Sequence, residues 1–78
     1  MKIYWEGSRK NVIGAKVKQL RLERGWTQKK LAQELQLGGY EFTDLTILRI
    51  EQGKRFVPDY ELRALARVFK VPYDTLLD

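Results

Sequence analysis

The sequence contains no cysteine and no histidine among its 78 residues. Without cysteine, a disulfide or a thiolate metal site is excluded, and without histidine the usual zinc ligand and acid–base catalyst are missing. No apolar run approaches the roughly 20 residues that cross a bilayer, and the first residues lack the apolar stretch of a secretory signal. We therefore expect a cytoplasmic protein with no membrane contact, no metal and no other cofactor.

The chain is short but rich enough in apolar residues to fold. Hydrophobic residues make up 44% of it, which is too many for a disordered chain. Its length suits one small core and leaves no separate ligand domain, so no small-molecule ligand is expected. We also expect no enzymatic activity, because the central acids occupy positions that suit exposed helical faces or helix ends. These acids are Glu23, Glu34, Glu51, Asp59 and Glu61.

Charge is distributed unevenly along the chain. Residues 1–30 carry nine basic and two acidic side chains, whereas the remainder carries six basic and eight acidic ones. This basic region favours a polyanionic partner such as nucleic acid. Charge alone fits a solvated surface equally well.

Two amphipathic helices are predicted before the middle of the chain. The first begins at Val12 after an Asn11 cap, buries a stripe at helical spacing and ends at Gly25. The stripe is Ile13, Val17 and Leu20. The cations outside it, which either contact phosphates or face solvent, are Lys16, Lys18, Arg21 and Arg24. The second helix is expected over residues 28–35, with Thr27 as its cap.

Two lysines in the first turn of this second helix are unusual. Lys29 and Lys30 lie where the helix dipole disfavours cations by a few tenths of a kcal/mol each. Free backbone N–H groups, the Gln28 amide and both lysines would together suit a bound phosphate next to Thr27. The alternative is that two exposed lysines carry a small penalty.

A glycine-containing turn over residues 36–42 precedes a third helix capped by Thr43 and ended by Gly53. Phe42 and Ile47 occupy the positions of a hydrophobic staple. Steps of about 100° per residue place Leu45, Arg49 and Gln52 on the outward face, flanked by Asp44 and Leu48.

This outward face has the chemistry to read bases. Arg49 suits guanine or a phosphate, Gln52 suits adenine, and Asp44 suits a cytosine amino group. Leu45 suits a thymine methyl group, but Leu45 and Leu48 also fit packing against the turn or a partner chain. Lys54 and Arg55 follow in a loop that suits a phosphate clamp.

The remainder predicts two further helical segments. Pro58 and Asp59 open a helix that Val71 and Pro72 stop, and residues 73–77 allow one last turn. The first ten residues are expected to form an arm, with Ile3, Tyr4 and Trp5 packed against the domain.

Taken together, residues 11–78 resemble the lambda-repressor-like, or xenobiotic-response-element, family of helix-turn-helix regulators. The matching residues are Ile13, Gly14, Leu20, Arg21, Gly25, Thr27, Gln28, Leu31, Ala32, Leu35, Ile50, Glu51, Gly53, Leu65, Ala66, Leu76 and Leu77. A branch with a longer turn is most similar, through Leu35, Gln36, Leu37, Arg55, Val57 and the segment from Asp59 to Leu62.

This resemblance implies five helices, the third of which recognises DNA, and a homodimer on a palindromic site. By position it implies that Gln28 binds phosphate, that Asp44, Leu45 and Arg49 face bases, and that Thr43 and Thr46 lie near the DNA backbone. Asp44 and Leu45 depart from the Arg-Ser or Gln-Ser of many members.

We therefore expect a compact all-α, five-helix domain that acts as a sequence-specific, double-stranded-DNA-binding transcriptional regulator. The predicted phosphate contacts are Thr27, Gln28, Lys29, Lys30, Thr43, Thr46, Lys54 and Arg55. The alternative is a protein-interaction module, of antitoxin type or a partner-dependent co-regulator, that docks through Leu45 and Leu48.

Overall fold

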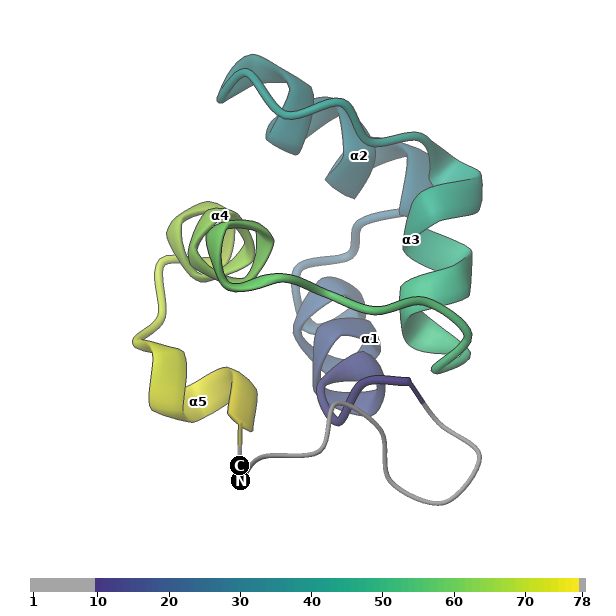
Figure 1. Cartoon of the computed structure of the whole chain (residues 1–78). Coiled ribbons are helices and arrows are strands. Elements are labelled where there is room, and N and C mark those ends of the chain that lie inside the picture. Colours follow the sequence, from purple (N-terminus) through teal and green to yellow (C-terminus); the bar gives the residue numbers. More distant parts are fainter. Residues whose placement is uncertain (1–9, 78) are drawn as a thin grey trace.

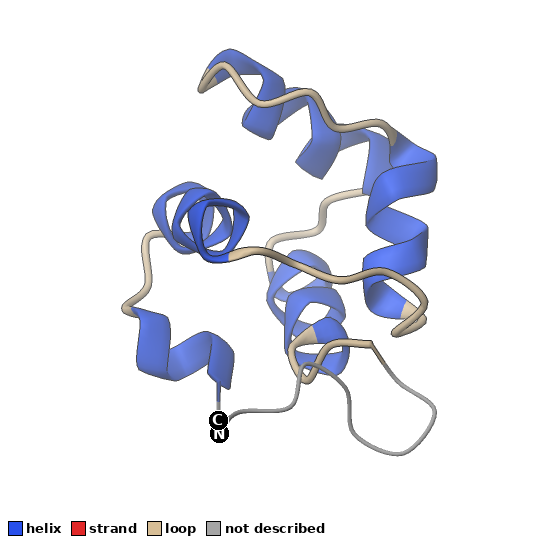
Figure 2. Ribbon diagram, in the orientation of Figure 1, coloured by secondary structure: helices blue, strands red, loops and turns tan. Residues whose placement is uncertain are grey.

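The computed structural model describes residues 10–77, and this part of the chain forms five α-helices and no strand (Figure 1, Figure 2). The helices are α1 (Gly14–Glu23), α2 (Gln28–Leu37), α3 (Asp44–Glu51), α4 (Asp59–Phe69) and α5 (Tyr73–Leu77). The predicted all-α class is confirmed. The expected packing of Ile3, Tyr4 and Trp5 lies outside the described residues.

The start of α1 shows how one polar side chain begins a helix. The Asn11 side-chain oxygen accepts the backbone N–H groups of Ile13 at 3.2 Å and Gly14 at 2.9 Å. Its amide nitrogen donates to the carbonyl oxygens of Ile50 and Arg55, so Asn11 is buried. Asn11 therefore satisfies N–H groups at the helix start, but the predicted position was wrong: Ile13 is the N-cap, and α1 begins at Gly14 rather than Val12. At the other end Gly25 has φ +68°, a conformation that costs glycine little.

The segment between α2 and α3 is shorter than predicted because α2 runs two residues further, to Leu37. Gly39 then turns the chain with φ +92°. Gln36 donates its side-chain amide to the Phe42 carbonyl oxygen at 2.6 Å, which ties the end of α2 to the residue before the α3 cap. Phe42 is fully buried with Ile47, as the staple predicts.

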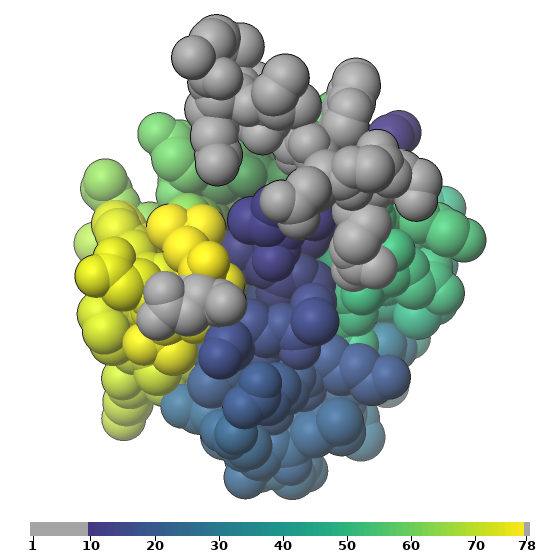
Figure 3. All heavy atoms as spheres, turned by 90° about the horizontal axis from the view of Figure 1, so that it is seen from below, coloured from purple at the N-terminus to yellow at the C-terminus, as the bar shows by residue number. Residues whose placement is uncertain are grey.

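The five helices enclose one core. α1 packs against α3, α4 and α5, and α2 packs against α3 and α4. Seen from below, α5 lies alongside the first residues of α1 (Figure 3). The largest fully buried side chains are Val17, Leu31, Leu35, Phe42, Ile47, Ile50, Leu65, Phe69 and Leu76. The helices thus hold α3 at one side of the molecule, with α4 and α5 across α1 from it (Figure 1).

Three charged residues are buried more deeply than the sequence suggested. Arg21 was expected at the surface but is buried. Glu51, the last residue of α3, and Glu61, in the first turn of α4, lie at helix ends as expected, yet their side chains have little exposure. Glu51 pairs with Arg21, and Glu61 pairs with Arg55. The prediction for Arg21 was wrong because helical periodicity reports the face of one helix and not the partners that other elements supply.

Candidate nucleic-acid interface

The outward side of α3 is exposed, as the sequence predicted. We call Asp44, Leu45, Arg49 and Gln52 the α3 face; all four are exposed, and Leu45 retains 48% of its accessible surface. Ile47 and Ile50 point the opposite way and are fully buried. Leu48, on the flank, is half-buried. Burial of the inner isoleucines therefore fixes which side of α3 a ligand can reach.

The start of α3 satisfies its own backbone donors. The Thr43 hydroxyl accepts the Thr46 N–H at 3.2 Å, and the Thr46 hydroxyl accepts the Thr43 N–H at 3.4 Å. The Asp44 carboxylate accepts the Leu45 N–H at 3.0 Å and adds a negative charge in the first turn. This helix start is thus capped and acidic, which disfavours a phosphate there.

The start of α2 has the opposite character. The Thr27 hydroxyl accepts the Lys30 N–H at 3.0 Å, but no acidic residue lies in the first turn. The backbone N–H groups of Gln28 and Lys29 have no acceptor among residues 10–77, as expected for the first residues of a helix. Lys29 is exposed, whereas the Lys30 ammonium pairs with Glu34 at 2.8 Å. Of the two predicted lysines, Lys29 is thus the one without an internal anion in the described part.

A buried polar cluster joins the start of α2 to the end of α3. The Arg21 guanidinium donates to both Glu51 carboxylate oxygens, at 2.6 and 3.1 Å, and to the Trp26 carbonyl oxygen at 2.8 Å. The Gln28 side-chain amide donates to the same carboxylate at 3.1 Å. Because an amide nitrogen carries two hydrogens, Gln28 keeps one donor while its orientation is fixed. α2 therefore presents its first turn beside the last turn of α3.

The loop after α3 places its two cations differently. Lys54 is exposed, but the Arg55 guanidinium makes a two-pronged ion pair with Glu61, at 2.5 and 2.9 Å. The hydrogen bond to Glu61 raises the pKa of Arg55, and the carboxylate charge adds to this effect. Arg55 also lies over the Phe42 ring, 5.7 Å from its centroid. Within residues 10–77, Arg55 is thus paired inside the protein, unlike Lys54.

The cluster around Glu51 was missed from the sequence. Arg21 and Glu51 are 30 residues apart, so no local spacing links them. The resemblance had marked both positions as matching residues without assigning them a role. This match to the family pattern was the available signal in the sequence. The contact itself exists only because α1 packs against α3.

A family model described as a helix-turn-helix domain matches residues 12–78. The chain belongs to that family. Helix-turn-helix domains bind DNA through a helix placed in the major groove, so the match supports DNA binding by this chain. The family is typically non-enzymatic. Comparison with curated proteins and with solved structures returned no match.

Two features are absent from residues 10–77 of this helix-turn-helix domain. No helix in that range has the length and apolar content needed to span a membrane. No group of three or more carboxylates in the same range could hold a metal ion.

Proposed function

We propose that this helix-turn-helix domain is a sequence-specific transcriptional regulator that seats the α3 face in the major groove of double-stranded DNA. The observation that carries the proposal is the exposure of Asp44, Leu45, Arg49 and Gln52 on one side of the helix that follows the turn. Arg49 would donate to guanine and Gln52 would pair with adenine. Neither side chain has a hydrogen-bond partner within residues 10–77 that would compete.

In this proposal the start of α2 holds a phosphate. The open N–H groups of Gln28 and Lys29 and the Lys29 ammonium supply donors and charge, and the cluster with Glu51 keeps the Gln28 amide in place. Lys54 would contact the neighbouring backbone. Thr27, Thr43 and Thr46 would contribute indirectly, by capping and so positioning the starts of α2 and α3, because each hydroxyl already accepts a backbone N–H.

We further propose that the chain belongs to the lambda-repressor-like branch of helix-turn-helix regulators and binds DNA as members of that branch do. A homodimer would present two α3 faces to a palindromic site. Residues 11–78 would form the DNA-binding domain and residues 1–10 an arm, and the protein would act in the cytoplasm.

Selection of bound duplexes from a random library tests the proposal. We expect enrichment of a palindrome with half-sites about 34 Å apart. Affinity for the selected site should fall by roughly 0.9 log units per tenfold rise in salt for each phosphate neutralised. Failure to bind any duplex at low salt would reject the proposal.

The exposed Leu45 supports a second candidate, in which the α3 face docks a protein. Leu48 contributes less to such a patch, because it is half-buried. Gel filtration and a pull-down with wild type and Leu45→Asp separate the candidates. A protein partner lost in the variant, combined with no duplex binding, would favour docking.

A further inference from the structure

A second exposed cationic surface lies on α4. Arg63, Arg67 and Lys70 recur at helical spacing along α4 and its C-cap, and all three are exposed. Figure 1 places α3 and the junction of α4 with α5 on opposite sides of α1. A duplex seated on the α3 face would therefore leave this surface uncovered.

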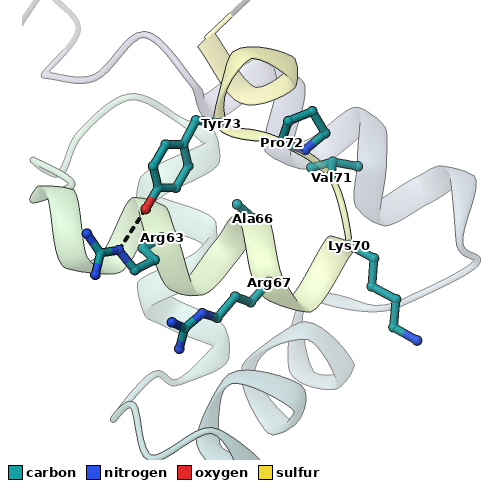
Figure 4. A pocket seen from close by; sticks show the side chains of 7 residues that line it. All are labelled: Arg63, Ala66, Arg67, Lys70, Val71, Pro72 and Tyr73. Atoms are coloured by element: carbon teal, nitrogen blue, oxygen red, sulfur yellow. Dashed lines mark hydrogen bonds between the residues drawn. The ribbon is translucent and has the colours of Figure 1, made fainter.

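The cations border an open depression with an apolar floor. Ala66, Val71, Pro72 and the ring of Tyr73 line it together with the three cations, and we call these seven residues the α4 depression. In Figure 4, Ala66 lies on the side of α4 that faces Tyr73 and Pro72, and Arg63 reaches the Tyr73 hydroxyl, whereas Arg67 extends from the opposite edge of α4 and Lys70 from its end. The surface thus combines positive charge at its rim with apolar area at its centre.

Two of the cations have no internal anion, and the third is held in position. The side chains of Arg67 and Lys70 have no hydrogen-bond or ion-pair partner among residues 10–77. The Arg63 Nε donates to the Tyr73 hydroxyl at 2.7 Å, which leaves its terminal nitrogens available. That hydrogen bond raises the pKa of Arg63, and the negative charge of Asp59 raises it further. Rigid placement lowers the ordering cost of binding a carboxylate.

Lys70 occupies a backbone position whose conformation favours glycine. Among residues 10–77, Lys70 is the one non-glycine residue with a positive φ, +59°. It is the C-cap of α4 and has the left-handed conformation. Glycine adopts this conformation without steric cost, so the lysine is not the best local choice for stability. Its charge does complement the helix dipole, and the test below separates that role from binding.

We propose that the α4 depression binds an acidic amphipathic segment of a partner protein. Carboxylates of the segment pair with Arg63 and Arg67, and an apolar side chain covers Val71 and Pro72. The apolar floor favours a peptide over a nucleic acid backbone, which has charge but no side chain to bury there. Arginine suits this role because its planar fork holds a carboxylate with two hydrogen bonds.

The test uses a fluorescein-labelled synthetic peptide that repeats the unit Glu-Leu-Glu-Glu-Leu, with binding followed by anisotropy at low salt. Arg67→Glu should weaken binding by about tenfold, because it removes one pair and adds repulsion. Lys18→Glu makes the same charge change at an exposed site on α1 and should alter binding by less than about twofold. Equal binding by wild type and Arg67→Glu would overturn the proposal.

Two further measurements identify the ligand class and the role of Lys70. A polyglutamate peptide without leucine should bind about tenfold more weakly, and Arg49→Ala should bind the amphipathic peptide normally. Lys70→Gly should raise the midpoint of thermal unfolding yet weaken peptide binding by about two- to fivefold. Polyglutamate binding as tight as the amphipathic peptide, or displacement of that peptide by a duplex, would count against a protein partner. A higher midpoint with unchanged peptide binding would remove Lys70 from the site.

Discussion

The starts of α2 and α3 are alike in one respect and opposite in another. Each helix begins with a threonine hydroxyl that accepts a backbone N–H. The first turn of α3 adds Asp44 and a reciprocal bond from Thr46, whereas the first turn of α2 has no acid and carries Lys29 and Lys30. An anion is therefore favoured at α2 and disfavoured at α3, although both are helix N-termini. The difference supports the proposal that the start of α2 binds phosphate while the exposed side of α3 contacts bases.

The largest expected effect comes from breaking the cluster that joins the two regions. Glu51→Ala should lower the free energy of unfolding by about 3–5 kcal/mol, because it leaves the Arg21 guanidinium buried without its carboxylate. Urea denaturation measures this loss. Glu34→Ala is the matched control, since it removes an exposed pair with Lys30 worth at most about 0.5 kcal/mol. Similar losses in the two variants would mean that the buried cluster contributes little.

Arg49→Ala tests whether α3 contacts bases. We expect it to weaken binding to the selected duplex by about 1–3 kcal/mol and to relax the preference at one base pair. Stability should stay unchanged, because Arg49 is exposed. Repeating the library selection with the variant checks the relaxed position. An unaltered site and affinity would show that Arg49 makes no base contact.

The two threonine caps provide a direct comparison of the helix starts. Thr27→Ala and Thr43→Ala should each lower the free energy of unfolding by about 1 kcal/mol, since each loses the bond to a backbone N–H. Only Thr27→Ala should also weaken binding to unrelated duplexes, because it loosens the phosphate site. Thr27→Ser, which keeps the hydroxyl, should restore both properties. Equal effects of the two alanine variants on binding would contradict the distinction.

Lys29→Glu should change stability only slightly, and it separates the charge that folding prefers at the start of α2 from the charge that DNA binding prefers there. An acid in the first turn should raise the free energy of unfolding by a few tenths of a kcal/mol. The same change should weaken all duplexes alike and reduce the slope of log affinity against log salt by about 0.9. Lys18→Glu controls for net charge. A slope equal to wild type would place the phosphate elsewhere.

Local signals in the sequence predicted much of the fold. The caps at Thr27 and Thr43 and the glycine that ends α1 follow from backbone hydrogen bonding over a few residues, and each was found where expected, whereas Ile13 and not Asn11 is the N-cap of α1. Helix ends were less certain, and α2 continued to Leu37. After Leu37, Gly38 and Gly39 can either continue the helix or turn the chain, so the pattern of apolar residues does not locate the last helical residue.

The sequence by itself determined the helices, their buried sides and hence the exposed side of α3, because these depend on periodicity and on contacts near in the chain. Only the tertiary structure decided which charges are available. Arg21 and Arg55 became internal partners of Glu51 and Glu61, while Arg67 stayed without an anion in the described part. The reason is physical: a charge is neutralised by whichever carboxylate the packing of other segments brings within about 3 Å, and the sequence records no such distance.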